Sequence, residues 1–316
     1  MRQKVICDVD TGGDDAVAVL AVGHSPRTEL VAVTVVAGNA PLEVTLENTL
    51  KVVEHGGLSH VPVCAGATHP LISALPPLDS TQERRLRLPA PTLRAQSQRA
   101  AEFLVDYYMS DAGPETILVP TAPLTNLALA LRLEPRIAQR IPRIVTMGGA
   151  YLEGNTTPSA EFNIYADPEA AHIVYSSGIP ITMVGLEVTG QALITLEDAA
   201  RIRSFGTLQA RIAGDLIAEE VQWFMDHLGW HSGQVYDACA AVGAMESSVI
   251  KTRRMHVAIE LTGTLTRGRT VADISGNHYN SKPPNVEVGV GIDRERFMRL
   301  LEEALSQTQA PPDVLC

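Results

Sequence analysis

Short runs of apolar, mostly β-branched residues alternate with amphipathic segments along most of the chain. The runs predict strands at residues 5–7, 30–37, 61–65, 117–119, 144–146 and 181–184. The amphipathic segments predict helices at residues 14–22, 42–54, 124–133, 168–177 and 209–228. Residues 30–37 are apolar on both faces, which is typical of a central strand in a parallel sheet. Because strands and helices alternate, the pattern predicts an α/β fold with a mostly parallel central sheet flanked by helices.

No linker-like stretch interrupts this alternation, so we expect a single domain over residues 1–316. Residues 70–91 are rich in proline, serine and arginine and predict a long surface loop. The helix expected at 209–228 leads into a segment rich in tryptophan and histidine, residues 223–231.

The overall charge and the length of the apolar runs exclude several classes of partner. A net charge of −11 disfavours nucleic acids and anionic membranes, because neither polyanion is attracted at long range. The longest apolar runs, 16–22 and 31–37, are far too short to cross a bilayer, and the run 5–7 is too short for a signal-peptide core. The four cysteines show no regular spacing, which favours reduced thiols. We therefore expect a cytoplasmic protein with no membrane or nucleic-acid partner.

A dense group of carboxylates follows the first predicted strand. Asp8, Asp10, Asp14 and Asp15 lie within eight residues, and the stretch 5–26 contains no lysine or arginine to neutralise them. A buried, unpaired carboxylate costs several kcal/mol, so it must either take up a proton or bind a cation. Oxygen ligands suit a hard cation such as Ca²⁺ or Mg²⁺. The carboxyl end of a strand is also where open α/β sheets place their sites.

Two other interpretations of the acidic run are open. Asp14 as a helix cap and Asp15 in the first helical turn would explain part of it. The spacing of Asp8 and Asp10 is also similar to the nucleophile motif of haloacid-dehalogenase-type phosphatases. That motif has threonine or valine where this chain has Gly12, and it leaves residues 13–15 unexplained.

The acidic run is the first of several segments that resemble the inosine–uridine nucleoside hydrolase family. Residues 8–16, DVDTGGDDA, are similar to the DTDPGxDDA-like motif near the start of that family. The likeness continues in the same order through residues 34–39, 119–126, 147–149, 154–155, 160–164, 167–171, 284–286 and 293–297. The first motif and the sequence EFN at 161–163 are specific when they occur together.

The resemblance implies a nucleoside hydrolase-like fold with a Rossmann-like core, and Ca²⁺-dependent hydrolysis of ribonucleosides to free base and ribose. The implied Ca²⁺ ligands are Asp10, Asp15, the backbone carbonyl of Thr121, and Asp237. Asp10 would also act as the general base that activates a metal-bound water. The implied substrate contacts are Asp14, Asn39, Met147, Asn155, Glu161 and Asn163. A small-molecule nucleoside is then the partner, and the family suggests a homodimer or homotetramer.

This set of oxygen-bearing side chains suits the chemistry, because cleavage of an N-glycosidic bond passes through an oxocarbenium-like state that negative groups stabilise. Each residue also has a structural alternative. Asn39 after a glycine is a natural turn residue. Glu161 and Asn163 would face solvent if they lay on a short strand. Asp237, before an alanine-rich segment, is a natural helix cap.

The chain departs from the family at the position before the last metal-binding aspartate. Family members often carry a histidine there, which is thought to assist the departing base, whereas this chain has Tyr236. A tyrosine hydroxyl, with an ordinary pKa near ~10, is a weak acid at neutral pH. His227 and His231 are alternative leaving-group residues, or they are simply the end of an amphipathic helix.

The second departure is at residues 78–85, LDSTQERR, where the family often has a His-Gly segment over the base. The arginines from Arg84 to Arg99 either attract an anionic substrate or form a solvated surface. The preferred base is therefore open. A different N-riboside such as a nicotinamide-type riboside, a ribose- or Ca²⁺-binding module with little turnover, and a phosphatase are the alternative functions.

Overall fold

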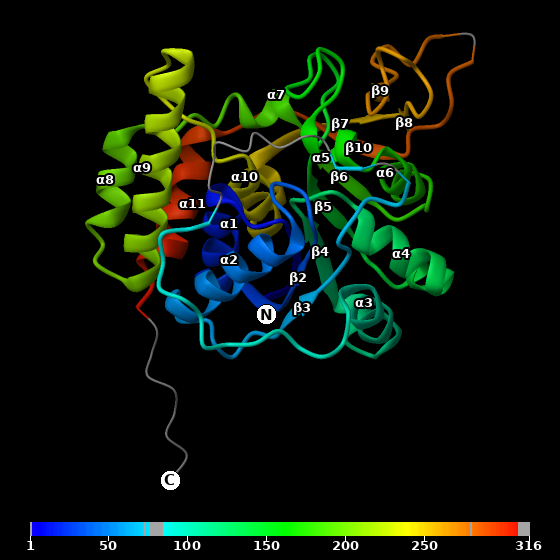
Figure 1. Cartoon of the computed structure of the whole chain (residues 1–316). Helices are drawn as coiled ribbons and strands as arrows, with labels where there is room; N and C mark the ends of the chain where they lie inside the picture. The colour runs from blue at the N-terminus through cyan, green and yellow to red at the C-terminus, as the bar shows by residue number, and fades with distance from the viewer. Residues whose placement is uncertain (1, 73, 76–84, 279, 309–316) are drawn as a thin grey trace.

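An eight-stranded sheet, in the order β3-β2-β1-β4-β5-β6-β10-β7, runs through the middle of the described structure (Figure 1). The computed structural model describes residues 2–72, 74–75, 85–278 and 280–308. All neighbouring strands are parallel except the edge strand β7, which pairs antiparallel with β10. A separate antiparallel pair, β8 and β9, lies beyond this sheet.

The strands have the following bounds: β1 Gln3–Val9, β2 Thr28–Val35, β3 Val63–Ala65, β4 Thr116–Pro120, β5 Ile144–Met147, β6 Ile181–Val184, β7 Ile250–Met255, β8 Val257–Ile259, β9 Thr270–Ala272 and β10 Val286–Ile292. The α-helices have the following bounds: α1 Gly13–His24, α2 Leu42–His55, α3 Ala100–Met109, α4 Thr125–Leu133, α5 Phe162–Ala166, α6 Pro168–Tyr175, α7 Leu186–Thr189, α8 Leu196–Arg203, α9 Leu208–Leu228, α10 Tyr236–Met245 and α11 Arg294–Ser306. Short 3-10 turns are η1 Gly113–Glu115, η2 Pro135–Gln139 and η3 Ser247–Val249.

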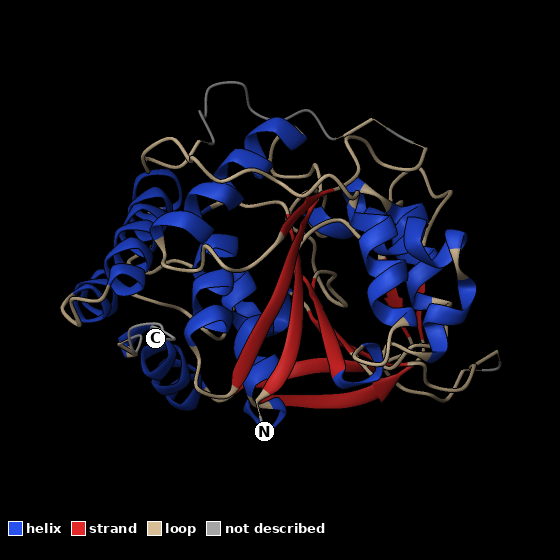
Figure 2. Ribbon diagram, turned by 90° about the horizontal axis from the view of Figure 1, so that it is seen from below, coloured by secondary structure: helices blue, strands red, loops and turns tan. Residues whose placement is uncertain are grey.

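The central strand β1 shows how one sequence serves both faces of the sheet. Val5, Cys7 and Val9 pack into the layer that contains α1, α9, α10 and α11, while Ile6 packs into the opposite layer with α3, α4 and α6. Helices lie on both sides of the sheet (Figure 2). Successive side chains of a strand point to opposite faces, so a strand covered on both sides must be continuously apolar. The predicted α/β architecture with a mostly parallel sheet is confirmed.

The strands and helices predicted from the apolar pattern are all present, with small differences at their ends. The pattern did not predict the strands that follow β6. β7 reads IKTRRM with its four central residues exposed, and β10 carries glycines at 289 and 291, so neither has the apolar run of a central strand. The described part of residues 70–91 contains no helix or strand, and most of the segment 78–85 lies outside the described residues.

Within the described ranges, no helix combines the length and the apolar character needed to span a membrane.

Candidate active site

The predicted site residues come together at the carboxyl edge of the sheet. Asp10 follows β1 directly, and Thr121 follows β4. Asp15 lies in the first turn of α1, and Asp237 in the first turn of the neighbouring helix α10. Asp10 and Asp15 are fully buried, and Asp237 is only 3% exposed. The fold therefore buries Asp237 beside Asp10 and Asp15, which lie more than 200 residues earlier in the sequence, at the carboxyl edge of the sheet.

Three carboxylates lie close enough together to hold one metal ion. One oxygen each of Asp14, Asp15 and Asp237 lie within 4.8 Å of one another. Asp15 and Asp237 were expected as ligands, whereas Asp14 was expected to contact ribose. Asp10 lies beside this trio, since the charge of Asp15 is one of the causes that raise the pKa of Asp10.

The raised pKa values of these carboxyl groups favour the binding of a cation. Burial, followed by the charge of Asp14, raises the pKa of Asp15 to about 7. Burial also raises the pKa of Asp10 and of Asp237 well above the ordinary value. In the described ranges no lysine or arginine forms an ion pair with Asp10, Asp15 or Asp237. A divalent cation would relieve the repulsion, and the all-oxygen donor set suits a hard ion.

The start of helix α1 corrects one structural alternative for the acidic run. Gly12, not Asp14, is the N-cap residue of α1. Asp15 completes the cap instead, because one of its oxygens accepts a hydrogen bond from the Gly12 N–H at 3.0 Å. Its other oxygen accepts from the Thr121 hydroxyl at 2.7 Å. Asp15 is thus a helix-capping residue and a member of the acidic cluster at once.

Asp8 belongs to the fold and not to the cluster. Its Oδ1 accepts hydrogen bonds from the Thr34 hydroxyl at 2.6 Å and from the Asn126 amide at 2.8 Å. Its Oδ2 is buried and has no hydrogen-bond partner among the described residues. Burial raises the pKa of Asp8 to about 6. This carboxylate therefore ties β1 to β2 and α4.

Asn39 fixes the orientation of Asp10. Its backbone N–H donates to Asp10 Oδ2 at 2.5 Å, and its side-chain amide donates to Asp10 Oδ1 at 3.3 Å and to Asp15 at 3.4 Å. The residue before it is a glycine that the sequence analysis did not single out. A Cβ atom at Gly38 would collide with Asp10 Oδ2 and with the ring of Pro123. Only glycine lets the 38–39 backbone approach Asp10 this closely.

A second group of predicted residues surrounds the N-terminus of the short helix α5. Glu161 is its N-cap, is 2% exposed, and accepts hydrogen bonds from the backbone N–H groups of Asn163 and Ile164. The alternative in which Glu161 and Asn163 face solvent on a strand is wrong, because both are buried at a helix start. The Asn163 amide donates to the carbonyls of Thr121 at 3.0 Å and Met147 at 3.3 Å.

Asn155 is exposed and lies at the same helix start, where its Oδ1 accepts a hydrogen bond from the Phe162 N–H at 3.0 Å. Asn163 links this second group to the Thr121 carbonyl, which is one of the implied metal ligands. Thr121 in turn binds Asp15. The predicted metal-binding and ribose-binding residues therefore form one connected network.

The three leaving-group candidates are placed differently. Tyr236 is the first residue of α10 and is half-buried beside the cluster; burial, followed by the charges of Asp14 and Glu220, raises the pKa of its hydroxyl above the ordinary value of 10. His227 is exposed and stacks on Trp223, with ring centroids 4.7 Å apart. His231 is also exposed. Of the three, Tyr236 alone is in electrostatic contact with the cluster.

The arginine-rich segment behaves as a solvated surface where it is described. Arg85 forms an ion pair with Glu47, and Arg87 approaches Glu219 at 3.9 Å, with both arginine side chains exposed. Arg84 lies outside the described residues.

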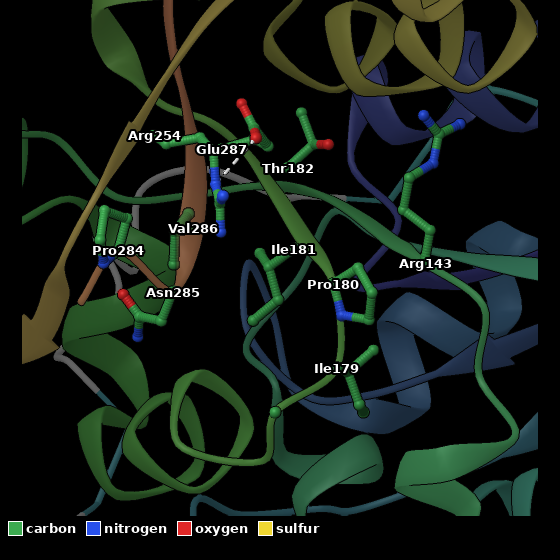
Figure 3. A pocket seen from close by; sticks show the side chains of 11 residues that line it. Arg143, Ile179, Pro180, Ile181, Thr182, Arg254, Pro284, Asn285, Val286 and Glu287 are labelled. Atoms are coloured by element: carbon green, nitrogen blue, oxygen red, sulfur yellow. Dashed lines mark ion pairs between the residues drawn. The ribbon is translucent and has the colours of Figure 1, made fainter.

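A separate hollow lies at the opposite, amino-terminal edge of the sheet, where β5, β6 and β10 begin (Figure 3). Its arginine Arg254 pairs with Glu287 at 3.4 Å, and none of the predicted site residues lines it. The chemistry-bearing residues are thus at the other end of the strands.

Sequence comparison identifies the class of protein in which this α/β sheet carries an acidic cluster at its carboxyl edge. Residues 5–299 match the family model described as inosine-uridine preferring nucleoside hydrolase. The chain belongs to this family. The match favours this interpretation of the acidic run over the phosphatase motif.

Several relatives cover nearly the whole chain. The inosine-uridine preferring nucleoside hydrolase of Crithidia fasciculata is 38% identical over 98% of this chain and 100% of its own length. The pyrimidine-specific ribonucleoside hydrolase RihB of Escherichia coli K12 is 38% identical over 96% of this chain and 97% of its own length.

Solved structures give the same result. A plant nucleoside hydrolase matches with a TM-score of 0.89 at 27% identity, covering 98% of this chain and 100% of its own. A purine-preferring ribonucleoside hydrolase from Gardnerella vaginalis matches with a TM-score of 0.88 at 29% identity, covering 96% and 98%. The names of these relatives include both pyrimidine and purine preferences.

Proposed function

We propose that this protein hydrolyses the N-glycosidic bond of ribonucleosides to free base and ribose, with Ca²⁺ as its metal ion. The observation that carries the proposal is the cluster of buried carboxylates at the carboxyl edge of the sheet, connected to a set of amide side chains. A neutral, hydroxyl-rich substrate is consistent with this lining, because the site offers many hydrogen-bond acceptors, and no basic group among the described residues pairs with Asp10, Asp15 or Asp237.

The metal ion would be held by Asp10, Asp15, Asp237 and the carbonyl of Thr121, with Asp14 close enough to contribute. Ca²⁺ fits because it accepts six to eight oxygen ligands in flexible geometry. When bound, the ion polarises a water molecule and the ribose hydroxyls and so lowers their pKa values.

Asp10 is the proposed general base that takes a proton from the attacking water. The hydrogen bonds from Asn39 reach both oxygens of its carboxylate and so hold it in one orientation. A positioned base of this kind contributes about 10²- to 10⁴-fold to the rate.

The remaining residues are proposed to bind the ribose. Asp14, Asn39 and Asn163 receive the 2′- and 3′-hydroxyls, and Met147 lines the pocket. Asn155 and Glu161 receive the 5′-hydroxyl. Negative oxygens around the ring also stabilise the positive charge that develops on ribose as the bond breaks.

Tyr236 is proposed to donate a hydrogen bond to the leaving base without transferring its proton. Burial and then the neighbouring carboxylates disfavour the tyrosinate form and raise the pKa of Tyr236, which makes the hydroxyl a poor acid. His227 and His231 remain the alternative proton donors. The wider alternatives are another N-riboside as substrate, or a ribose- or Ca²⁺-binding protein with little turnover.

One experiment separates these functions. The purified protein is incubated with a panel of ribonucleosides, nicotinamide riboside and p-nitrophenyl riboside, with EDTA or with Ca²⁺ or Mg²⁺, and released reducing sugar is measured. The proposal is supported if EDTA abolishes the release of sugar, Ca²⁺ restores it, and the Asp10→Asn variant releases none. The exposed residue Asp111 supplies a matched control, Asp111→Asn.

Binding of the nucleoside without release of sugar would support the binding-module alternative instead. Light scattering of the same sample tests the proposed homodimer or homotetramer.

A further inference from the structure

The loop that follows β5 has five consecutive backbone N–H groups with distant partners. Gly148 donates to the Val184 carbonyl at 3.2 Å, and Gly149 donates to Glu161 Oε2 at 2.8 Å. Ala150 donates to the Thr270 hydroxyl at 2.9 Å. The next two N–H groups, at residues 151 and 152, share a single acceptor. Since the loop has no regular hydrogen-bond ladder, side chains satisfy its backbone.

That single acceptor is Glu187, on α7. Its Oε1 accepts from the Tyr151 N–H at 2.9 Å and from the Leu152 N–H at 2.7 Å. Its Oε2 is buried and has no hydrogen-bond partner among the described residues. Burial raises the pKa of this carboxyl group. A carboxylate kept at this position despite its desolvation cost indicates that the loop depends on it.

The anchored loop leads directly into the part of the site that is proposed to bind the 5′-hydroxyl. Gly149, two residues before Tyr151, is the residue whose N–H holds Glu161. Asn155 lies three residues after Leu152, and its Oδ1 accepts a hydrogen bond from the Phe162 N–H. The Gly149 carbonyl also accepts from the Leu186 N–H at 3.1 Å, so two successive residues of α7 hold the loop.

We propose that Glu187 is a positioning residue that holds the 148–155 loop, and through it Glu161 and Asn155, against the 5′-hydroxyl of the substrate. This inference rests on the proposed ribonucleoside hydrolysis. Because Glu187 acts through this loop, its removal is expected to weaken chiefly the interactions that the 5′-hydroxyl makes.

The test compares a ribonucleoside that the wild-type protein cleaves with the 5′-deoxy form of the same nucleoside. Glu187→Ala removes the shared acceptor, and Glu187→Gln keeps an acceptor oxygen while removing the charge. Glu153→Ala is the matched control, because Glu153 is an exposed glutamate in the same loop. The measurements are kcat and KM for both substrates, with circular dichroism to verify folding.

For Glu187→Ala we expect kcat/KM for the ribonucleoside to fall by about tenfold or more, because misplacing substrate-binding groups by about 1 Å is enough to cost such factors. For the 5′-deoxy substrate we expect a change below about threefold, since the interaction is already missing. Glu187→Gln and Glu153→Ala should behave as the wild type.

Equal losses on the two substrates would overturn the inference, because a merely structural residue affects both alike. A wild-type protein that does not distinguish the two substrates would also overturn it. If Glu187→Ala does not fold, Glu187→Asp decides, since it keeps the charge but withdraws the acceptor by one methylene. Failure of the wild type to release ribose from any ribonucleoside would instead refute the proposed function.

Discussion

Replacing Asp15 by asparagine tests whether the acidic cluster is a cation site. Burial and the charge of Asp14 raise the pKa of Asp15 from 3.8 to about 7. The folded protein without metal therefore binds this proton more tightly than the unfolded chain does. The free energy of unfolding then contains a contribution that is fully present below about pH 4 and is lost as the pH rises to about 7.

The size of this contribution follows from the two pKa values. Each tenfold difference in proton affinity corresponds to about 1.4 kcal/mol, so deprotonated Asp15 costs the metal-free fold about 4 kcal/mol at pH 8, of which about 3 kcal/mol is lost between pH 5 and pH 8. Asparagine does not titrate. It offers one acceptor oxygen in place of two, so it keeps only part of the hydrogen bonds that Asp15 accepts from Gly12, Asn39 and Thr121, which adds a pH-independent cost of about 1 kcal/mol.

The assay is denaturant unfolding at pH 5 and pH 8, in EDTA and in excess Ca²⁺, with Asp111→Asn as the control. In EDTA, the stability of Asp15→Asn relative to wild type should rise by about 3 kcal/mol from pH 5 to pH 8. Ca²⁺ at a hundred times its Kd should add about 2.7 kcal/mol to the wild type and far less to Asp15→Asn. A parallel pH dependence of the two proteins in EDTA, or equal stabilisation by Ca²⁺, would refute the reasoning.

Three further substitutions test the proposed roles by steady-state kinetics. Asp10→Asn should lower kcat by about 10²- to 10⁴-fold while folding is retained, and a loss below tenfold would rule out a general base. Tyr236→Phe should lower kcat by less than about tenfold, since its hydroxyl is a poor acid; a loss near 10³-fold would show true proton transfer. Gly38→Ala should lower kcat by about 10²-fold by displacing Asp10, whereas Gly13→Ala, whose Cβ meets no atom within 4 Å, should leave activity unchanged.

The core of the fold was predictable because its strands and helices have apolar patterns within short stretches of sequence. The strand at 5–7 and residues 16–22 of the first helix are continuous apolar runs, and both runs are buried in the structure. The edge strand β7 could not be predicted in the same way. Its sequence KTRR is exposed, and it is a strand only because β10 pairs with it. Pairing between distant segments leaves little trace in the local pattern.

The candidate site was predictable as a set of residues but not in its detailed arrangement. Charge density pointed to the run that contains Asp10, Asp14 and Asp15, and family likeness pointed to Asp10, Asp15 and Asp237 as ligands. The likeness gave Asp14 a contact with ribose, whereas its carboxylate lies within 4.8 Å of those of Asp15 and Asp237. The role of Glu187 was not predicted. Its partners are backbone N–H groups 35 and 36 residues away, and such a contact cannot be inferred from residue type.

Asp8 and Asp15 show why charge density alone does not define the metal site. Both are fully buried aspartates from one short segment, and burial raises the pKa of each. Asp8 receives two side-chain hydrogen bonds and stands apart from the other carboxylates, so these donors offset part of the cost of burying its charge. Asp15 shares its surroundings with Asp14 and Asp237, and hydrogen bonds from Gly12 and Thr121 do not cancel their repulsion. The neighbours of a buried carboxylate therefore decide its role. Where they are donors it joins strands, and where they are other carboxylates it requires a cation.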